Sequence, residues 1–141
     1  MNTIAFSYNP EEMVASCIIS YNNLEFVGTA QCHPEDEEFA SERTGCTIAE
    51  LRARLKMLKY MKNGQLKPIL EAFKHTMSCM KMSKHFNTRS YEARMIRRKI
   101  KQYETDLENI KKEIEICNNN LKTYIDGKDK IYKKLKQARS K

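Results

Sequence analysis

The chain has 141 residues, of which 40% are hydrophobic and 31% charged, and its formal net charge is +8. So high a charged fraction, together with the absence of tryptophan, favours long helices with narrow apolar stripes over a thick globular core. No apolar stretch approaches the ~18 residues that a transmembrane helix needs, and residues 1–5 lack the cationic start of a signal peptide, so we expect a cytoplasmic protein without membrane contact.

The five cysteines predict free thiols. Cys17, Cys32, Cys46, Cys79 and Cys117 are odd in number and form no C-x-x-C pair, which is typical of a protein kept in a reducing compartment. Cys32 and Cys46 with the neighbouring His33 offer three potential metal ligands, whereas a structural zinc site normally has four. We therefore expect neither a metal nor a cofactor.

Residues 13–32 predict an antiparallel β-hairpin. Strand-forming residues fill 13–21, Asn22-Asn23 can adopt the positive φ angles of a tight turn, and partial alternation of apolar and polar residues follows in 24–32. A lone hairpin is marginally stable in water. This hairpin must therefore pack on helices or pair with another copy of the chain.

An acidic segment follows the hairpin and contains Glu35, Asp36, Glu37 and Glu38. One interpretation is a capped turn in which carboxylates bond loop amides, and composition favours it because such turns are common. The other is the polar lip of a pocket, at which His33 and the carboxylates recognise hydroxyl groups. His33 is accordingly one candidate ligand-binding residue. We assign 1–46 to the hairpin and acidic loop.

Residues 47–81 predict the first helical region. Thr47-Ile48-Ala49-Glu50 fits a capping box, so we expect the helix to begin at Thr47. Apolar residues then recur at helical spacing up to Met80. Asn63-Gly64 interrupts the pattern and Pro68 suits the first turn of a new helix, so the region is either two helices in line or one helix bent near Gly64.

Residues 82–141 predict a loop, over 82–89, and then one long helix. Apolar side chains occupy eleven of twelve positions of a six-heptad seam, which indicates a coiled-coil-like packing surface. From Arg89 to Gln137 such a helix is roughly 70 Å long, which exceeds any head that the preceding residues can form. The helix before it can cover part of the seam, and the rest predicts self-association. The seam residues are Ile96, Ile100, Tyr103, Leu107, Ile110, Ile114, Cys117, Leu121, Tyr124, Ile131 and Leu135, with Lys128 as the exception.

The expected fold class is α+β, within a single domain overall: a small N-terminal antiparallel β-hairpin or sheet, then long helices. No sequence motif of a nucleotide hydrolase, serine hydrolase or zinc peptidase is present, and four glycines are too few for a glycine-rich phosphate cradle. Cys32 and His33 are adjacent, so their side chains point to opposite faces of a strand and form no catalytic dyad. We expect a binding protein with no catalytic residues.

Basic residues dominate from Arg52 onward, and such a surface attracts phosphates. In the 82–89 loop, Phe86, Asn87 and Arg89 could stack on a base, read its edge and hold a phosphate. The alternative is structural: Phe86 is a hydrophobic staple, and Asn87 or Thr88 caps the next helix. The complete candidate ligand-binding set is Phe86, Asn87, Arg89, Arg94, Arg97, Arg98, Arg52 and His33.

Six short runs resemble a family of phage proteins, the first type of Thoeris anti-defence protein. The resemblance covers about residues 24–125 in outline. The runs that carry it are Phe26-Val27-Gly28-Thr29-Ala30, Cys32-His33-Pro34-Glu35-Asp36, Ser41-Glu42-Arg43-Thr44-Gly45, Ile48-Ala49 with Arg52-Ala53, Leu66-Lys67-Pro68, and Ser83-Lys84-His85-Phe86-Asn87 with Ser90-Tyr91-Glu92. The resemblance implies a sponge for cyclic ADP-ribose isomers, in some members also for cyclic oligonucleotides, that binds its ligand without cleaving it. It further implies a homo-oligomer, from a dimer up to a hexamer, in the host cytoplasm, and ligand binding by an aromatic residue, an asparagine and arginines.

The function expected is thus phage immune evasion by sequestration of a cyclic nucleotide signal. The alternative is a basic coiled-coil protein of a phage that inhibits another protein or binds nucleic acid. Nucleic acid is the less expected partner. Dependence of binding on salt distinguishes the two, because extended phosphate contacts weaken steeply with salt.

Overall fold

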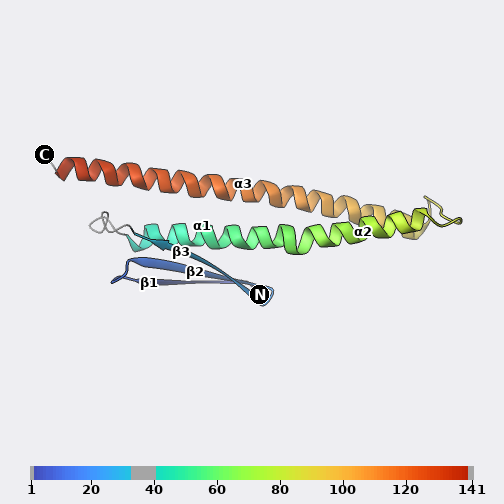
Figure 1. The fold of residues 1–141 in the computed structure, drawn as a ribbon, viewed down its shortest axis with the longest axis horizontal. Coiled ribbons are helices and arrows are strands. Elements are labelled where there is room, and N and C mark those ends of the chain that lie inside the picture. Colours follow the sequence, from blue (N-terminus) through green and yellow to red (C-terminus); the bar gives the residue numbers. More distant parts are fainter. Residues whose placement is uncertain (1, 33–40, 140–141) are drawn as a thin grey trace. The chain divides into compact units, whose positions relative to one another are not determined.

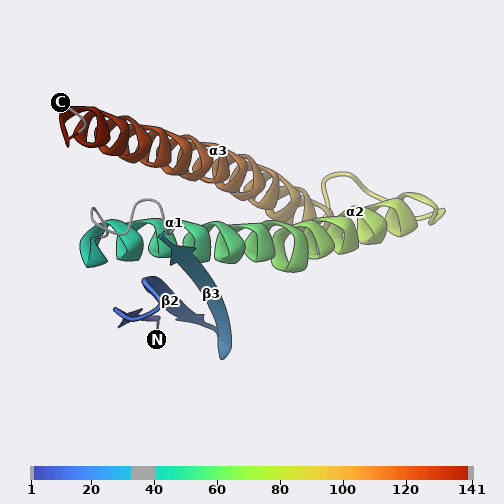
Figure 2. The same cartoon turned by 60° about the vertical axis from the view of Figure 1, so that its left-hand side comes forward.

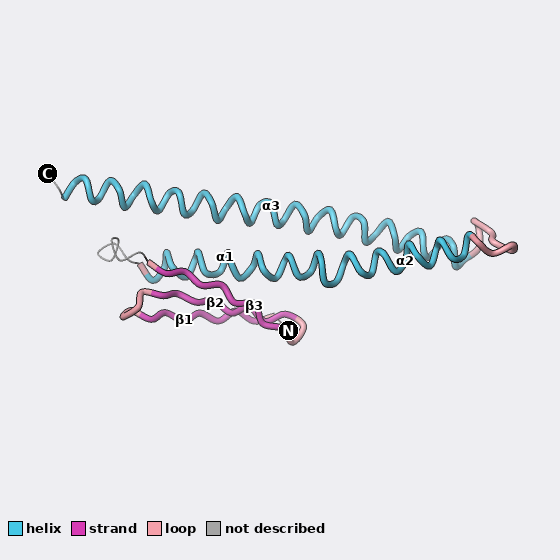
Figure 3. The backbone as a smooth tube through the Cα atoms, viewed as in Figure 1, coloured by secondary structure: helices cyan, strands magenta, loops and turns pink. Residues whose placement is uncertain are grey.

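The computed structural model describes residues 2–32 and 41–139 and has the α+β class expected (Figure 1). An N-terminal antiparallel sheet precedes long helices, and the last helix is the longest (Figure 3). The elements are β1 (Thr3–Asn9), β2 (Val14–Tyr21), β3 (Leu24–Gln31), α1 (Glu42–Tyr60), a π-helix η2 (Met61–Leu66), α2 (Lys67–Lys81) and α3 (Tyr91–Arg139).

By packing, the described chain divides into two compact units. Unit 1 comprises residues 1–57 and 114–141, and thus holds the sheet, most of α1 and the C-terminal part of α3. Unit 2 comprises residues 58–113, with η2, α2 and the first part of α3. The segments expected from the sequence, divided after residues 46 and 81, remain a prediction, because these units are defined by packing and not by chain order.

The sheet of unit 1 has three strands in the order β1-β2-β3. The predicted hairpin is β2 and β3, whose register pairs Tyr21 with Leu24, and Asn22 and Asn23 have the positive φ angles of 50° and 63° expected of the turn. β1 was not predicted, although Ile4, Phe6 and Tyr8 alternate with smaller residues as a half-buried strand requires.

Helix α1 lies on β2 and β3 at unusually close range (Figure 2). A Cβ atom added at Gly28 would stand 2.1 Å from the carbonyl oxygen of Ala49 and 2.4 Å from the amide nitrogen of Ala53. Only small residues permit this approach, and the buried cluster is rich in them. It comprises Ala15, Cys17, Ile19, Ala30, Ile48, Ala49 and Ala53.

The prediction that the first helix begins at Thr47 is wrong, because α1 begins five residues earlier, at Glu42. Ser41 is its cap: the Ser41 hydroxyl accepts a hydrogen bond from the amide of Thr44 at 3.3 Å, and the Ser41 carbonyl accepts one from the amide of Gly45 at 3.0 Å. The Thr47 hydroxyl instead donates to a backbone carbonyl within the helix, at 2.9 Å. The extra turn is stabilised by packing, since a Cβ at Gly45 would lie 2.9 Å from that of Ala15.

The helical backbone does not break at Gly64. Residues 61–66 form a π-helical turn that joins α1 directly to α2, so of the two predicted forms the continuous helix with a local distortion is the one observed. Pro68 lies in the first turn of α2, where its missing N–H is tolerated.

In unit 2, α3 runs back along α2 (Figures 1 and 2). The rings of Phe73 and Tyr103 stack with their centroids 5.7 Å apart, and Lys74 forms an exposed ion pair with Glu104 at 3.5 Å. The ring contact contributes more than the ion pair, because exposed pairs are worth ~0–1 kcal/mol.

The predicted seam of α3 is a packing surface along most of its length. Within unit 2 it buries Ile110. Within unit 1 it buries Cys117, whose thiol donates to the carbonyl of Leu51 at 3.4 Å, while Leu121 and Tyr124 pack against the core. Near the C-terminus the predicted register no longer faces the core: Tyr132, which lies outside the seam, is buried, whereas Ile131 is 58% exposed and Leu135 is 43% exposed. None of the helices among residues 2–32 and 41–139 has the length and hydrophobicity to span a membrane.

Replacing Gly28 by alanine should destabilise the protein, because the new methyl group meets backbone atoms of α1 that cannot move independently. We expect a loss of about 1–3 kcal/mol in the free energy of unfolding, the usual range for an overpacked site. Urea denaturation monitored by circular dichroism measures it.

Gly127→Ala is the matched control, since a Cβ there meets no atom within 4 Å and the residue lies inside α3. This substitution should raise the free energy of unfolding by about 0.5–1 kcal/mol. Equal effects of the two substitutions would contradict the close contact between α1 and the sheet.

Candidate functional site

The loop between α2 and α3 is held by short-range hydrogen bonds. Amides of Met82 and Ser83 donate to the carbonyls of Cys79 and Met80, which closes the end of α2. The amide of Phe86 then donates to the carbonyl of Ser83 at 3.2 Å. The turn therefore has a defined backbone path, as a binding loop requires.

Ser90 caps α3. Its hydroxyl accepts from the amide of Ala93 at 3.2 Å and its carbonyl accepts from the amide of Arg94 at 3.0 Å. The expectation that Asn87 or Thr88 caps this helix is therefore wrong. A hydrophobic staple needs an apolar residue directly before the cap, and Arg89 occupies that position. The half-buried Phe86 stands three residues too early to be the staple.

Asn87 instead shapes the loop. Its side-chain oxygen accepts from the amide of Arg89 at 2.9 Å, and its backbone carbonyl accepts from the amide of Ser90 at 3.0 Å. This is an Asx turn, which fixes the side-chain orientation. The NH₂ group of Asn87 has no hydrogen bond to any described residue, so it remains available to an acceptor on a ligand.

The arginines of this region divide into one structural residue and three exposed ones. The guanidinium of Arg97 donates to the carbonyl of Thr88 and so ties the second turn of α3 back to the loop. Arg89, Arg94 and Arg98 are exposed and make no side-chain hydrogen bond or ion pair within the described part of the chain. Arg94 and Arg98 are four residues apart and thus lie on one face of α3.

The local charge is strongly positive. Between residues 82 and 101 the only carboxylate is Glu92, against seven cations: Lys84, Arg89, Arg94, Arg97, Arg98, Lys99 and Lys101. The N-terminal end of α3 adds the partial positive charge of the helix dipole. We call residues 82–101 the basic turn. The structure thus places six of the eight predicted site residues in one segment of unit 2.

Arg52 and His33 are not part of that segment. Arg52 belongs to unit 1, where its guanidinium donates to the carbonyl of Thr29 at 2.7 Å, so it has a structural role at the sheet. His33 and the acidic residues 35–38, with the pocket lip and the turn proposed for them, lie outside the described residues.

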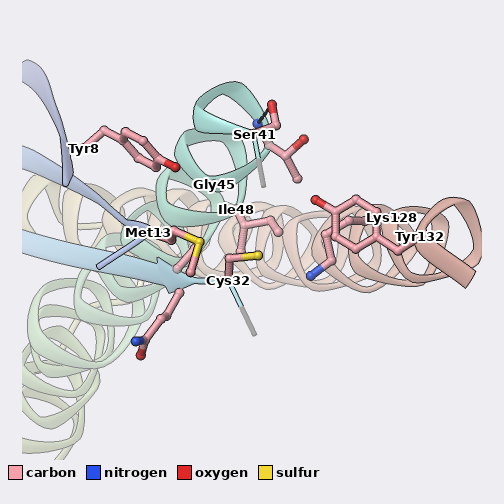
Figure 4. A pocket seen from close by; sticks show the side chains of 11 residues that line it. Tyr8, Met13, Cys32, Ser41, Gly45, Ile48, Lys128 and Tyr132 are labelled. Atoms are coloured by element: carbon pink, nitrogen blue, oxygen red, sulfur yellow. Dashed lines mark hydrogen bonds between the residues drawn. The ribbon is translucent and has the colours of Figure 1, made fainter. Parts of the chain in front are cut away.

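Unit 1 contains a small pocket between the end of β3, the start of α1 and α3 (Figure 4). Tyr8, Met13, Cys32, Lys128 and Tyr132 are among its lining residues. Its volume of about 30 Å³ accommodates roughly one water molecule and not a nucleotide.

A larger groove in unit 1 runs between α1 and the C-terminal part of α3 and measures about 540 Å³. That volume is in the range of small-molecule sites, but Lys128 is its only charged lining residue and the walls are mainly apolar. Sequence reasoning did not predict this groove. It is less suited to a phosphate than the basic turn is.

The surroundings of three thiols disfavour their thiolate form. Burial raises the pKa of Cys17, Cys46 and Cys117 above the ordinary value of 9.0. The carboxylate of Glu50 adds to the rise at Cys17, and that of Glu42 adds to it at Cys46. A raised pKa disfavours the thiolate, which is the nucleophilic form of cysteine. Among the described residues, no three His, Cys, Asp or Glu side chains gather closely enough to bind a metal ion.

Compared with known protein families, with proteins of curated function and with solved structures, the chain shows no match. The resemblance to the Thoeris anti-defence family therefore stays a prediction.

The free energy of unfolding should fall as the pH rises through the alkaline range. The folded-state pKa of each of the three thiols is raised, so the unfolded chain loses these protons first. The stability is complete below the ordinary thiol pKa of 9.0 and is lost as the pH approaches the raised values. Urea unfolding between pH 7 and pH 10 measures the slope.

Cys17→Ala isolates the contribution of this thiol to the pH dependence. The variant should start less stable, because it lacks a buried sulfur, but its stability should decline less with pH. An identical decline in the two proteins would contradict the raised pKa of Cys17.

Proposed function

We propose that the protein binds a cyclic nucleotide immune signal at the basic turn and sequesters it without cleaving it. The observation that supports this most directly is the juxtaposition of Phe86, the free NH₂ group of Asn87 and three unpaired arginines on a turn whose backbone is fixed. The proposal extends to the ligand class that the family resemblance implies, a cyclic ADP-ribose isomer, and to action in the host cytoplasm.

Each of these groups matches a different part of a cyclic ADP-ribose isomer. Arg89, Arg94 and Arg98 offer planar guanidinium donors that match phosphate oxygens. Phe86 offers a ring for an adenine face, and the NH₂ group of Asn87 offers a donor for a ring nitrogen. Each group therefore has a distinct part of the ligand to contact.

Sequestration without cleavage agrees with the state of the thiols. The buried cysteines of unit 1 have raised pKa values, the opposite of what an attacking cysteine needs. Tight sequestration is favoured when the site is ordered before the ligand binds, because little conformational entropy is then lost on binding. The hydrogen bonds within the turn support such an ordered site.

Self-association is part of the same proposal. The last two residues of the predicted α3 seam are turned away from the core, with Ile131 58% exposed and Leu135 43% exposed beside the buried Tyr132. A second copy, or several up to a hexamer, would cover these residues and bring further basic turns into one particle. Contiguous exposed apolar residues commonly mark protein–protein contacts.

Ligand retention tests the function. The purified protein is incubated with cyclic ADP-ribose isomers and cyclic oligonucleotides, separated from free ligand by gel filtration, and heated. We expect one of these compounds to be retained and then released chemically unchanged. Accumulation of a linear or hydrolysed product with time would make the protein an enzyme and overturn the proposal.

Two double variants locate the site in that experiment. Arg94→Gln with Arg98→Gln should reduce affinity about tenfold or more, since each charge-assisted hydrogen bond contributes about 1.5–3 kcal/mol. Lys133→Gln with Lys134→Gln removes the same charge from an exposed part of α3 outside the basic turn and should leave affinity nearly unchanged. Equal losses, with a steep dependence on salt, would support nucleic-acid binding instead.

Phe86→Ala should weaken nucleotide binding by about tenfold, because loss of a stacking ring costs ~1–3 kcal/mol. The half-buried ring also packs on the protein, so a modest fall in melting temperature is expected. Isothermal titration and a melting curve on the same sample give both quantities. Normal affinity with reduced stability would remove Phe86 from the site.

A further inference from the structure

The two edges of the sheet differ in how their backbone groups are satisfied. The amide of Cys32 donates to the carbonyl of Met13 at 3.1 Å, which makes positions 13 and 32 a hydrogen-bonded pair. Bonded and non-bonded pairs alternate along an antiparallel ladder. On β3, therefore, the N–H and C=O groups of Val27 and Thr29 point away from β2, towards the free edge.

That β3 edge is closed by α1. The ammonium group of Lys56 donates to the carbonyl of Val27, and the guanidinium of Arg52 donates to the carbonyl of Thr29, each at 2.7 Å. Both are charge-assisted bonds, and two positive charges stand along the edge. A further strand is discouraged from pairing here, as natural proteins commonly arrange for exposed edges.

No described residue protects the β1 edge in this way. By the same alternation, β2 uses Val14, Ser16, Ile18 and Ser20 to bond β1, and their partners by register are Asn9, Ser7, Ala5 and Thr3. The backbone groups of Ile4, Phe6 and Tyr8 consequently point outward, and no described strand pairs with them. The strand Thr3–Asn9 contains no charged residue and no proline.

The side chains of the same three residues lie on the face that carries the core. Ile4, Phe6 and Tyr8 stand opposite Ile19, Cys17 and Ala15 of β2, which are buried beneath α1. Yet Ile4 is 47% exposed and Phe6 is 51% exposed. Among the described residues, the core beneath α1 is formed by β2 and β3, and β1 contributes only Tyr8 at its margin. Ile4, Phe6 and Tyr8 thus combine exposed apolar side chains with outward backbone groups that no described strand pairs with.

We propose that β1 pairs antiparallel with β1 of a second copy, about a two-fold axis at Phe6. The two three-stranded sheets then form one sheet of six strands. In this register Phe6 faces its own counterpart and Ile4 faces Tyr8, so every outward N–H and C=O group of the three residues is bonded.

A second copy fits this edge for two reasons. The side chains of Ile4, Phe6 and Tyr8 complement those of a second copy: the two Phe6 rings lie side by side at the axis, and each Ile4 lies beside a Tyr8. The edge is also locally neutral, although the chain carries a net charge of +8 that opposes contact between copies elsewhere. Beside Phe6 is a shallow hollow whose lining includes Glu42 and Arg43, one charge of each sign. Two copies therefore approach here without net repulsion.

Disulfide trapping tests the register. In a Cys79→Ser background, which removes the exposed thiol, Phe6→Cys should link two copies, since facing Cα atoms about 5.5 Å apart suit a disulfide. Ile4→Cys alone should not link, because the two equivalent residues lie about 13 Å apart along the strands. A mixture of the Ile4→Cys and Tyr8→Cys proteins should link. Absence of linkage at Phe6, or equal linkage in all single variants, would overturn the proposal.

Particle mass provides the second readout. Ile4→Lys with Phe6→Lys puts charges on the edge and should lower the mass measured by light scattering, with an unchanged circular dichroism spectrum. Leu24→Lys, at a similarly exposed residue of β3, should leave the mass unaltered. An unchanged mass in the β1 variant would overturn the interface. The inference does not depend on the ligand. Nucleotide retention is measured separately on the same variants, so the interface and the proposed function are tested independently.

Discussion

The close contact between α1 and the sheet determines most of the packing in unit 1. Gly28 lets the backbone of α1 approach β3 so nearly that no side chain fits between them, and Ala49 and Ala53 present equally small surfaces from the helix. Such an approach excludes water and forms many dispersion contacts with few large residues. It explains how a chain with a high charged fraction still builds a core.

The same contact decides the role of two basic residues. Because α1 lies so close, the long side chains of Arg52 and Lys56 reach over the rim of the sheet to carbonyls of β3. Their hydrocarbon stems cover apolar surface while the charged ends bond the backbone. Arg52 therefore stabilises the fold, and part of its guanidinium is already hydrogen-bonded to the protein. The arginines of the basic turn, by contrast, include three with no partner in the described chain, which is why the proposed anion site lies there.

A helix that covers only part of a sheet leaves an edge to be completed. Over β2 the inner face is buried, whereas over β1 the same face is half exposed. Two features thus remain incomplete in a single chain, the exposed apolar side chains of β1 and the end of the α3 seam. Both are apolar, and both fit the expectation that the chain acts as an oligomer. The hairpin's need for additional cover, evident from its small size, is met by α1 on one face and by β1 along the edge of β2.

The sequence by itself determined the α+β class, the tight turn at Asn22-Asn23 and the long final helix, because each depends on local periodicity and turn chemistry. The alternation of Ile4, Phe6 and Tyr8 with smaller residues also indicates β1. Only the tertiary structure decided that α1 is capped by Ser41 and not by Thr47, since the contact of Gly45 with Ala15 outweighs a local capping preference. It likewise decided that Ser90 caps α3 and that Arg52 bonds the sheet. Several residues near the start of a helix can each serve as its cap, so the local sequence does not identify which one does. A hydrogen bond between residues far apart in the chain, such as Arg52 to Thr29, leaves no local pattern in the sequence.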